Sequence, residues 1–223
     1  MDLWQDFLTN DGKLIHKWVH YFGIYERHFS WFRGKSVTFL EIGVSKGGSL
    51  QMWQRYFGPL ARIVGIDIDP SCRAHEQPGI SVRVGDQGDP AFLQEIIEEF
   101  GVPDIVLDDG SHQMRHVNAT FDLLYPKLPK NGIYMVEDLH TAYWPGFGGG
   151  LKREGTFIET VKDLIDELNA DHSRGALAPT AFTRSTHSMH IYDSMVVFER
   201  GRHTAKGAPQ IGTPDPNYGK SPG

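Results

Sequence analysis

The stretch VTFLEIGVSKGGS, from Val37 to Ser49, contains the signal that decides the fold. It begins as a run of apolar and β-branched residues, which is typical of a buried strand, and continues into a turn rich in glycine and serine. A strand that leads into a helix through such a turn is typical of α/β proteins, in which the turn and the free N–H groups of the helix face a ligand. The turn lacks the GxGxxG spacing of dinucleotide-binding proteins, and this disfavours NAD as the ligand.

The same succession of a short apolar strand and a helical pattern repeats along the chain. Strands are predicted over residues 37–43, 62–67, 80–86, 104–109 and 132–138, and helices over 50–56, 90–100, 113–125 and 156–169. Two segments rich in β-branched and aromatic residues, 182–192 and 194–200, predict a terminal antiparallel hairpin. The chain is therefore predicted to form an α/β, Rossmann-like, doubly wound and mainly parallel sheet with a C-terminal antiparallel hairpin.

A length of 223 residues fits one large domain. We expect a single domain over residues 1–200 that begins with a helical segment over residues 1–35, because aromatic and apolar residues recur there at helical spacing. One or two amphipathic helices are predicted in this segment, and their aromatic faces favour a homo-oligomer. Residues 201–223 are rich in glycine and proline and poor in apolar residues, so they are predicted to form a flexible tail.

Composition excludes several classes of partner. The net charge is −6 and no cluster of Lys and Arg occurs, which argues against a nucleic-acid partner. No apolar run approaches the roughly 18 residues of a membrane helix, and the acidic N-terminus lacks the pattern of a secretory signal. The single cysteine, Cys72, fits a reducing compartment. We therefore expect a cytoplasmic protein with no membrane partner.

Polar residues follow the second and third predicted strands, at the edge where an open parallel sheet binds its ligand. Asp67 ends the strand RIVGID and is placed to accept hydrogen bonds from ribose hydroxyls. Asp86 and Gln87 end the next strand and are placed to bind an adenine edge. Each acid alone could be a solvated strand end, but the three residues together predict a nucleoside pocket.

The stretches VLDDGSH and VED end the fourth and fifth predicted strands, which are neighbours in this topology. Adjacent strands lie about 4.8 Å apart, so Asp109, Glu137 and Asp138 are expected to converge. Three carboxylates repel one another unless a cation joins them, and an all-oxygen set suits Mg²⁺ better than zinc. The alternative is that Glu137 and Asp138 cap the next helix or pair with Lys or Arg.

The segments LEIGVSKGGSLQMW, VLDDGSH and VEDLHTAYW together resemble the class I S-adenosylmethionine (SAM) dependent methyltransferases. Within that class they are similar to the metal-dependent sugar O-methyltransferases of macrolide biosynthesis, of the mycinamicin and macrocin type, whose relatives include a protein called cephalosporin hydroxylase. The resemblance covers about residues 37–200. It implies Mg²⁺-dependent transfer of a methyl group from SAM to a sugar hydroxyl of a glycosylated natural product or polysaccharide.

The resemblance also implies roles for individual residues. The expected cofactor contacts are Glu41, Gly43, Ser45, Asp67, Asp86 and Gln87, with Asp108 near the methionine end of SAM. The resemblance implies that Asp109, Glu137 and Asp138 bind the metal, as their convergence also suggests, and that His112 is the general base. A histidine suits this task because a metal acidifies an aliphatic hydroxyl and an imidazole then accepts the proton. The competing role for His112 is to cap the helix that begins near Gln113.

The loop YWPGFGGGLKREG, residues 143–155, is predicted to be an active-site lid, because loops of this length inside a domain are often functional. Trp144 and Phe147 are expected to stack on a sugar ring, and His140 and Tyr143 to line the site. A passive linker with buried aromatic anchors is the alternative.

Three other functions remain open at this point. A catechol-type O-methyltransferase would share SAM and the metal but need His112 less, because a phenol is already more acidic. An oxidoreductase like the hydroxylase-named relative would need a redox cofactor, for which the sequence shows no clear ligand set. A non-catalytic SAM-binding module would bind the nucleoside and transfer no methyl group.

Overall fold

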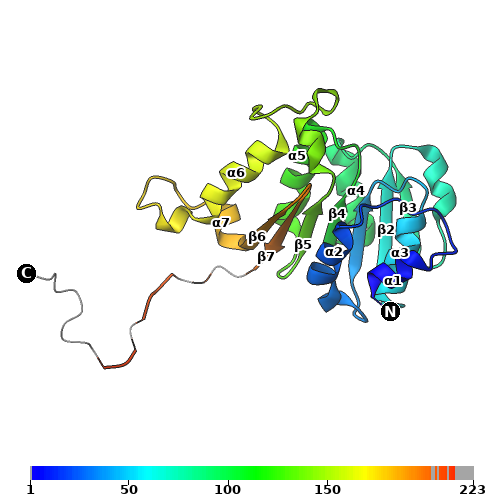
Figure 1. The fold of residues 1–223 in the computed structure, drawn as a ribbon, viewed down its shortest axis with the longest axis horizontal. Coiled ribbons are helices and arrows are strands. Elements are labelled where there is room, and N and C mark those ends of the chain that lie inside the picture. Colours follow the sequence, from blue (N-terminus) through cyan, green and yellow to red (C-terminus); the bar gives the residue numbers. More distant parts are fainter. Residues whose placement is uncertain (1, 202–203, 205, 210, 214–223) are drawn as a thin grey trace, which may run out of the picture.

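The computed structural model describes residues 2–201, 204, 206–209 and 211–213. One seven-stranded sheet has the order β3-β2-β1-β4-β5-β7-β6 (Figure 1). The strands are β1 (Thr38–Ile42), β2 (Arg62–Asp67), β3 (Ile80–Val84), β4 (Ile105–Asp108), β5 (Ile133–Val136), β6 (Thr186–Tyr192) and β7 (Met195–Arg200). The strands β1 to β5 pair in parallel, whereas β7 runs antiparallel to both β5 and β6. The predicted mainly parallel sheet with a terminal hairpin is confirmed.

Helices cover both faces of this sheet (Figure 1). They are α1 (Leu3–Leu8), α2 (Tyr21–Phe29), α3 (Gly48–Phe57), α4 (Pro90–Phe100), α5 (Met114–Leu124), α6 (Phe157–Leu168) and α7 (Ala181–Ser185), with short 3₁₀ helices η1 (Ser30–Phe32), η2 (Pro70–His75), η3 (Tyr125–Lys127), η4 (Leu139–Tyr143), η5 (Pro145–Phe147) and η6 (Ala170–His172). Successive side chains of a strand point to opposite faces, so β1 places Phe39 against α1 to α3 and Leu40 against α4 to α6. None of the helices within the described residues is long and apolar enough to cross a bilayer.

The N-terminal segment forms two helices with a non-helical stretch between them. Tyr25 and Phe29 of α2 are fully buried and pack on Trp53 of α3. Their spacing of four residues places them on one helix face, as the sequence predicts. Residues 14–18 have no regular secondary structure, and the first four of them line a cavity at the carboxyl edge of the sheet.

Two predictions on domain ends have different outcomes. The predicted flexible tail lies largely outside the described residues, and the single domain over residues 1–200 stays a prediction. The predicted strand over residues 182–192 is wrong at its start, because residues 181–185 form α7. Thr180 and Thr183 form a reciprocal capping box there, and this local hydrogen bonding outweighs the β-branched pattern.

Gly43 is where β1 approaches the turn after β4 most closely. Its φ is +95°, and an added Cβ would lie 2.1 Å from the carbonyl oxygen of Asp109. Replacement by alanine is expected to destabilise the fold by about 2–4 kcal/mol, as the sum of backbone strain and overpacking. Urea unfolding measures this change. Gly34→Ala is the control, because Gly34 has a φ of +70° but no heavy atom within 4 Å of the added Cβ. Equal losses in the two variants would contradict the role of the close approach.

Candidate active site

A cavity of about 390 Å³ opens at the carboxyl ends of β1, β2 and β4. Its lining includes five residues that the sequence analysis assigns to the cofactor, namely Gly43, Ser45, Asp67, Asp86 and Gln87. The N-terminal segment contributes a wall from Leu14 to Lys17. The topology therefore brings the glycine-rich turn and the strand-end acids together around one space.

Asp67 holds the glycine-rich turn in shape. Its Oδ2 accepts hydrogen bonds from the backbone N–H groups of Val44 and Ser45, at 2.8 and 2.9 Å, and its Oδ1 accepts one from Asp69 at 2.9 Å. Burial alone would raise the pKa of Asp67, but these backbone donors outweigh burial and lower it. The carboxylate is thus ionised at the cavity wall.

Two of the predicted cofactor contacts, Glu41 and Asp108, do not line the cavity. Asp108 is 2% exposed and accepts hydrogen bonds from Gln87 Nε2 at 3.1 Å and from the Tyr134 hydroxyl at 3.1 Å. Glu41 is fully buried and accepts hydrogen bonds from Ser49 Oγ at 2.8 Å and Trp53 Nε1. Burial raises the pKa of each carboxyl to about 7. Both side chains support the turns behind the cavity, and their direct contact with a cofactor stays a prediction.

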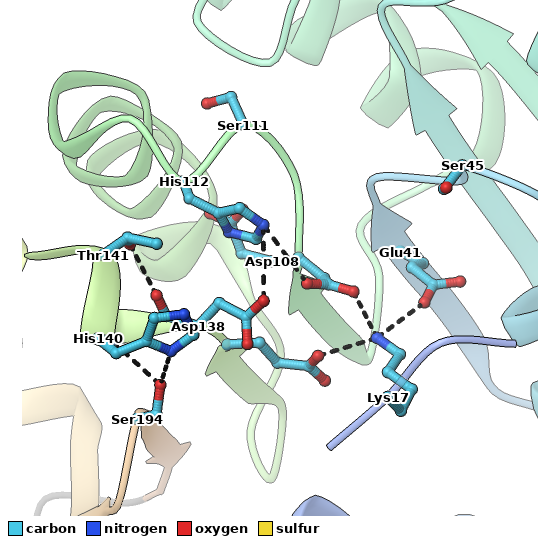
Figure 2. A network of polar contacts seen from close by, with 12 residues as sticks. Lys17, Glu41, Ser45, Asp108, Ser111, His112, Asp138, His140, Thr141 and Ser194 are labelled. Atoms are coloured by element: carbon cyan, nitrogen blue, oxygen red, sulfur yellow. Dashed lines mark hydrogen bonds and ion pairs between the residues drawn. The ribbon is translucent and has the colours of Figure 1, made fainter. Parts of the chain in front are cut away.

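The carboxylates that follow β4 and β5 converge, and His112 lies with them (Figure 2). His112 Nε2 is 3.9 Å from Asp109 Oδ1 and 3.8 Å from Asp138 Oδ2. Ligand atoms of these three residues all lie within 4.8 Å of one another. The backbone of His112 and of Asp138 has positive φ, +55° and +53°. These tight turns direct both side chains to one point.

Glu137, the third predicted metal ligand, is held by the N-terminal segment, and its contact with a metal stays a prediction. Its side chain is 1% exposed, Oε2 accepts a hydrogen bond from Lys17 Nζ at 2.9 Å, and Oε1 accepts one from the Tyr25 hydroxyl. Burial raises the pKa of Glu137, and Lys17 opposes that shift. Glu137 therefore pairs with a lysine, which is the alternative that the sequence analysis left open for it.

Lys17 is the residue that sequence reasoning missed. Its Nζ lies 2.5 Å from Asp109 Oδ2, 2.9 Å from Glu137 Oε2 and 3.6 Å from Glu41 Oε1 (Figure 2). Burial alone would lower the pKa of Lys17, but the three carboxylates outweigh burial and raise it. The side chain is 4% exposed, so a buried ammonium neutralises part of the cluster. Lys17 is one of several basic residues in the N-terminal segment, so no signal in the sequence singles it out.

Aromatic residues of the predicted lid form a rim beside His112. The ring of Phe147 lies 6.3 Å from that of His112 and 5.9 Å from that of Trp144, which is half-exposed. The His140 ring lies 4.8 Å from Trp144, and its Nδ1 lies 2.5 Å from Ser194 Oγ. His140, Tyr143, Trp144 and Phe147 do not line the cavity, so their contact with a substrate and the movement of a lid stay predictions.

A second group of metal-type ligands, His28, His190 and Glu199, joins α2 to the hairpin and does not line the cavity. His28 Nδ1 lies 2.8 Å from Glu199 Oε1, and His28 Nε2 lies 2.9 Å from the Tyr192 hydroxyl. The hydrogen bond from His28 lowers the pKa of Glu199 to about 2. We interpret the group as a contact that fixes α2 on the sheet, because both ring nitrogens of His28 already have partners.

Comparison with known proteins identifies relatives of this chain. No protein-family model matches the chain. It is 39% identical over 214 residues to demethylmacrocin O-methyltransferase of Streptomyces fradiae, an alignment of 88% of this chain and 53% of that protein. It is 38% identical over 200 residues to mycinamicin VI 2''-O-methyltransferase of Micromonospora griseorubida, covering 83% of this chain and 49% of that protein. The chain is homologous to these O-methyltransferases over about half of their length.

The solved structures agree with this homology. MycE, a methyltransferase of the mycinamycin pathway solved with Mg, S-adenosylhomocysteine (SAH) and mycinamycin VI, matches with a TM-score of 0.79 and 35% identity. That match covers 96% of this chain and 56% of MycE. The chain thus has the fold of the matched part of MycE, and it spans about half the length of the curated relatives it matches.

Proposed function

We propose that this chain is a Mg²⁺-dependent O-methyltransferase that transfers the methyl group of SAM to a sugar hydroxyl of a glycosylated natural product or polysaccharide. The observation that carries the proposal is the position of the cavity lined by Asp67 and Asp86, directly beside the cluster of Asp109, His112 and Asp138. The homology to demethylmacrocin and mycinamicin VI O-methyltransferases supports the same reaction class.

The cofactor would be held by the cavity. Asp67 and Asp86 offer side-chain oxygens at the strand ends, where the ribose and adenine of a nucleoside are bound in sheets of this type. Gly43 and Ser45 form the turn that a ligand would approach. SAM, when bound, supplies a methyl group on a positively charged sulfur.

The carboxylate cluster fits a hard divalent cation. Asp109 Oδ1 and Asp138 Oδ2 face the same point beside His112, and carboxylate oxygens are the ligands that Mg²⁺ prefers. Asp109 and Asp138 would hold the ion, and Glu137 would join them where the ion displaces Lys17. When bound, Mg²⁺ supplies positive charge that acidifies a sugar hydroxyl.

His112 is proposed to accept the hydroxyl proton at Nε2. The two carboxylates near this nitrogen, at 3.8 and 3.9 Å, would stabilise the imidazolium that results. With SAM bound, the sugar oxygen would take the methyl group from the sulfonium sulfur, so the hydroxyl proton would stay on His112 Nε2 and the sulfur would become neutral. The aromatic rim of Trp144 and Phe147 supports a sugar as the acceptor, because such rings pack on sugar faces.

The test is an assay of the purified chain with SAM and Mg²⁺ on glycosylated macrolides, simple rhamnosides and catechol, with SAH and methylated product measured by mass spectrometry. We expect methylation of glycosides that a chelator suppresses. Faster methylation of catechol than of any glycoside would replace the proposal by a catechol-type enzyme. SAH binding with no transfer to any acceptor would favour a non-catalytic SAM-binding module.

Asp67→Asn is expected to weaken SAH binding about 10- to 100-fold. A carboxylate makes charge-assisted hydrogen bonds of about 1.5–3 kcal/mol, which the amide cannot match, and the glycine-rich turn loses part of its anchor. Isothermal titration calorimetry measures the change. Asp69→Asn is the control, because that exposed side chain accepts from Ser71, two residues further along the chain, and not from the glycine-rich turn. Unchanged affinity in Asp67→Asn would remove Asp67 from the binding site.

A further inference from the structure

The N-terminal segment presents three donors to the carboxylate cluster, four residues apart in the chain. Lys17 Nζ donates to Asp109 Oδ2 at 2.5 Å and to Glu137 Oε2 at 2.9 Å. The Tyr21 hydroxyl donates to Asp138 Oδ1 at 2.7 Å, and the Tyr25 hydroxyl donates to Glu137 Oε1. Each of the three carboxylates is thus anchored by a side chain from a segment that lies far away in the sequence.

These donors divide the carboxylate oxygens into two sets. The inner oxygens, Asp109 Oδ2, Asp138 Oδ1 and both oxygens of Glu137, are engaged by the N-terminal segment. The outer oxygens, Asp109 Oδ1 and Asp138 Oδ2, face His112 (Figure 2). Lys17 is therefore the buried positive charge on the inner side of the cluster.

We propose that Lys17 is a built-in counter-ion, which holds the carboxylates in place without a metal and sets the affinity for a divalent cation by competing with it for Asp109 and Glu137. This inference rests on the proposed function, since that function supplies the divalent ion. Lys17 is a positioning residue that acts through the carboxylates. Tyr21 and Tyr25 support it by orienting Asp138 and Glu137.

Electrostatics gives the direction of the effect. Coulomb attraction between charges a few ångströms apart is strong where the charges are buried, as those of Lys17 and Glu137 are, so the ammonium offsets part of the repulsion among the carboxylates. The same ammonium repels a second cation and occupies oxygens that would bind it. Removing the charge of Lys17 should destabilise the metal-free cluster and strengthen its hold on a divalent ion.

The test is a titration with Mn²⁺ of the purified unmodified chain and of the variants Lys17→Met and Lys17→Gln. Binding is measured by calorimetry and by the electron paramagnetic resonance signal of the free ion. Both variants are expected to bind Mn²⁺ roughly 10- to 100-fold more tightly than the unmodified chain. In chelator, both variants should unfold at a lower temperature than the unmodified chain. Added Mg²⁺ should raise their unfolding temperature by more than it raises that of the unmodified chain. Lys17→Gln keeps a polar side chain, so it serves if Lys17→Met does not fold without metal.

The control is Lys13→Met, which removes the same charge from the same segment at a residue whose Nζ contacts His75 and not the cluster. Its Mn²⁺ affinity should stay within about threefold of the unmodified chain. Folded Lys17 variants with unchanged or weaker Mn²⁺ binding would overturn the inference. Absence of Mn²⁺ binding by the unmodified chain, with SAH binding intact, would instead remove the metal from the proposed function.

Discussion

Replacement of His112 by Asn is expected to lower kcat for methyl transfer by about 10²- to 10⁴-fold, which is the usual contribution of a general base. His112 Nε2 is the imidazole nitrogen that faces both Asp109 and Asp138, and an amide in its place accepts no proton at neutral pH. Asn is the suitable substitution because it tolerates the positive φ of +55° at this position. Initial rates at saturating SAM, with a glycoside that the unmodified chain methylates, measure the loss.

The same variant should bind SAH within about threefold of the unmodified chain, since the proposed role is in proton transfer. His187→Asn, on the exposed face of β6, is the control and should keep the full rate. A rate within threefold of normal for His112→Asn would contradict the base role. It would favour an acceptor that is already acidic, such as a phenol.

Asp138→Asn is expected to weaken Mn²⁺ binding by more than about 100-fold and to lower the rate of methyl transfer in parallel. Loss of a residue that only orients a metal ligand costs about 10- to 100-fold in affinity, so loss of a charged ligand should exceed that range. The substitution is conservative in shape, because Asn tolerates the positive φ of +53° and can still accept a hydrogen bond from Tyr21. Calorimetric titration with Mn²⁺ measures the affinity.

Asp163→Asn, an exposed acid on α6, is the matched control and should bind Mn²⁺ normally. If Asp138→Asn retained normal Mn²⁺ affinity, the ion would be bound elsewhere. The assignment of Asp109 and Asp138 as its ligands would then be wrong.

The strands and helices of the sheet were predictable because each one carries its own periodic pattern. The bounds of β2 and α4 agree with the prediction to the residue, since Asp67 ends one and Pro90 begins the other. The other parallel strands were predicted two or three residues too long. Their terminal acids and glycines follow the strand and belong to the turns, where the ladder of hydrogen bonds has already ended.

The site was predictable only as far as topology determines it. Parallel strands place their final acids at one edge, which is why the position of Asp109 and Asp138 could be inferred. Side chains of neighbouring residues point in different directions at the end of a strand, so Glu137 faces inward to Tyr25 while Asp138 faces His112. The positions of the acids in the sequence do not show this difference. Lys17 lies 92 residues from Asp109 in sequence and on a stretch without regular structure, so no local pattern reveals the contact.

Calorimetric titration of the purified chain with SAH, once with Mg²⁺ and once with a chelator, tests most directly whether the cavity binds the cofactor beside a metal site. We expect saturable binding at one site per chain in both conditions, with an affinity or enthalpy that changes when Mg²⁺ is present, because the cavity adjoins Asp109 and Asp138. Absence of SAH binding in both conditions would contradict the assignment of Asp67 and Asp86 to a nucleoside. The proposed methyl transfer would then have no cofactor site.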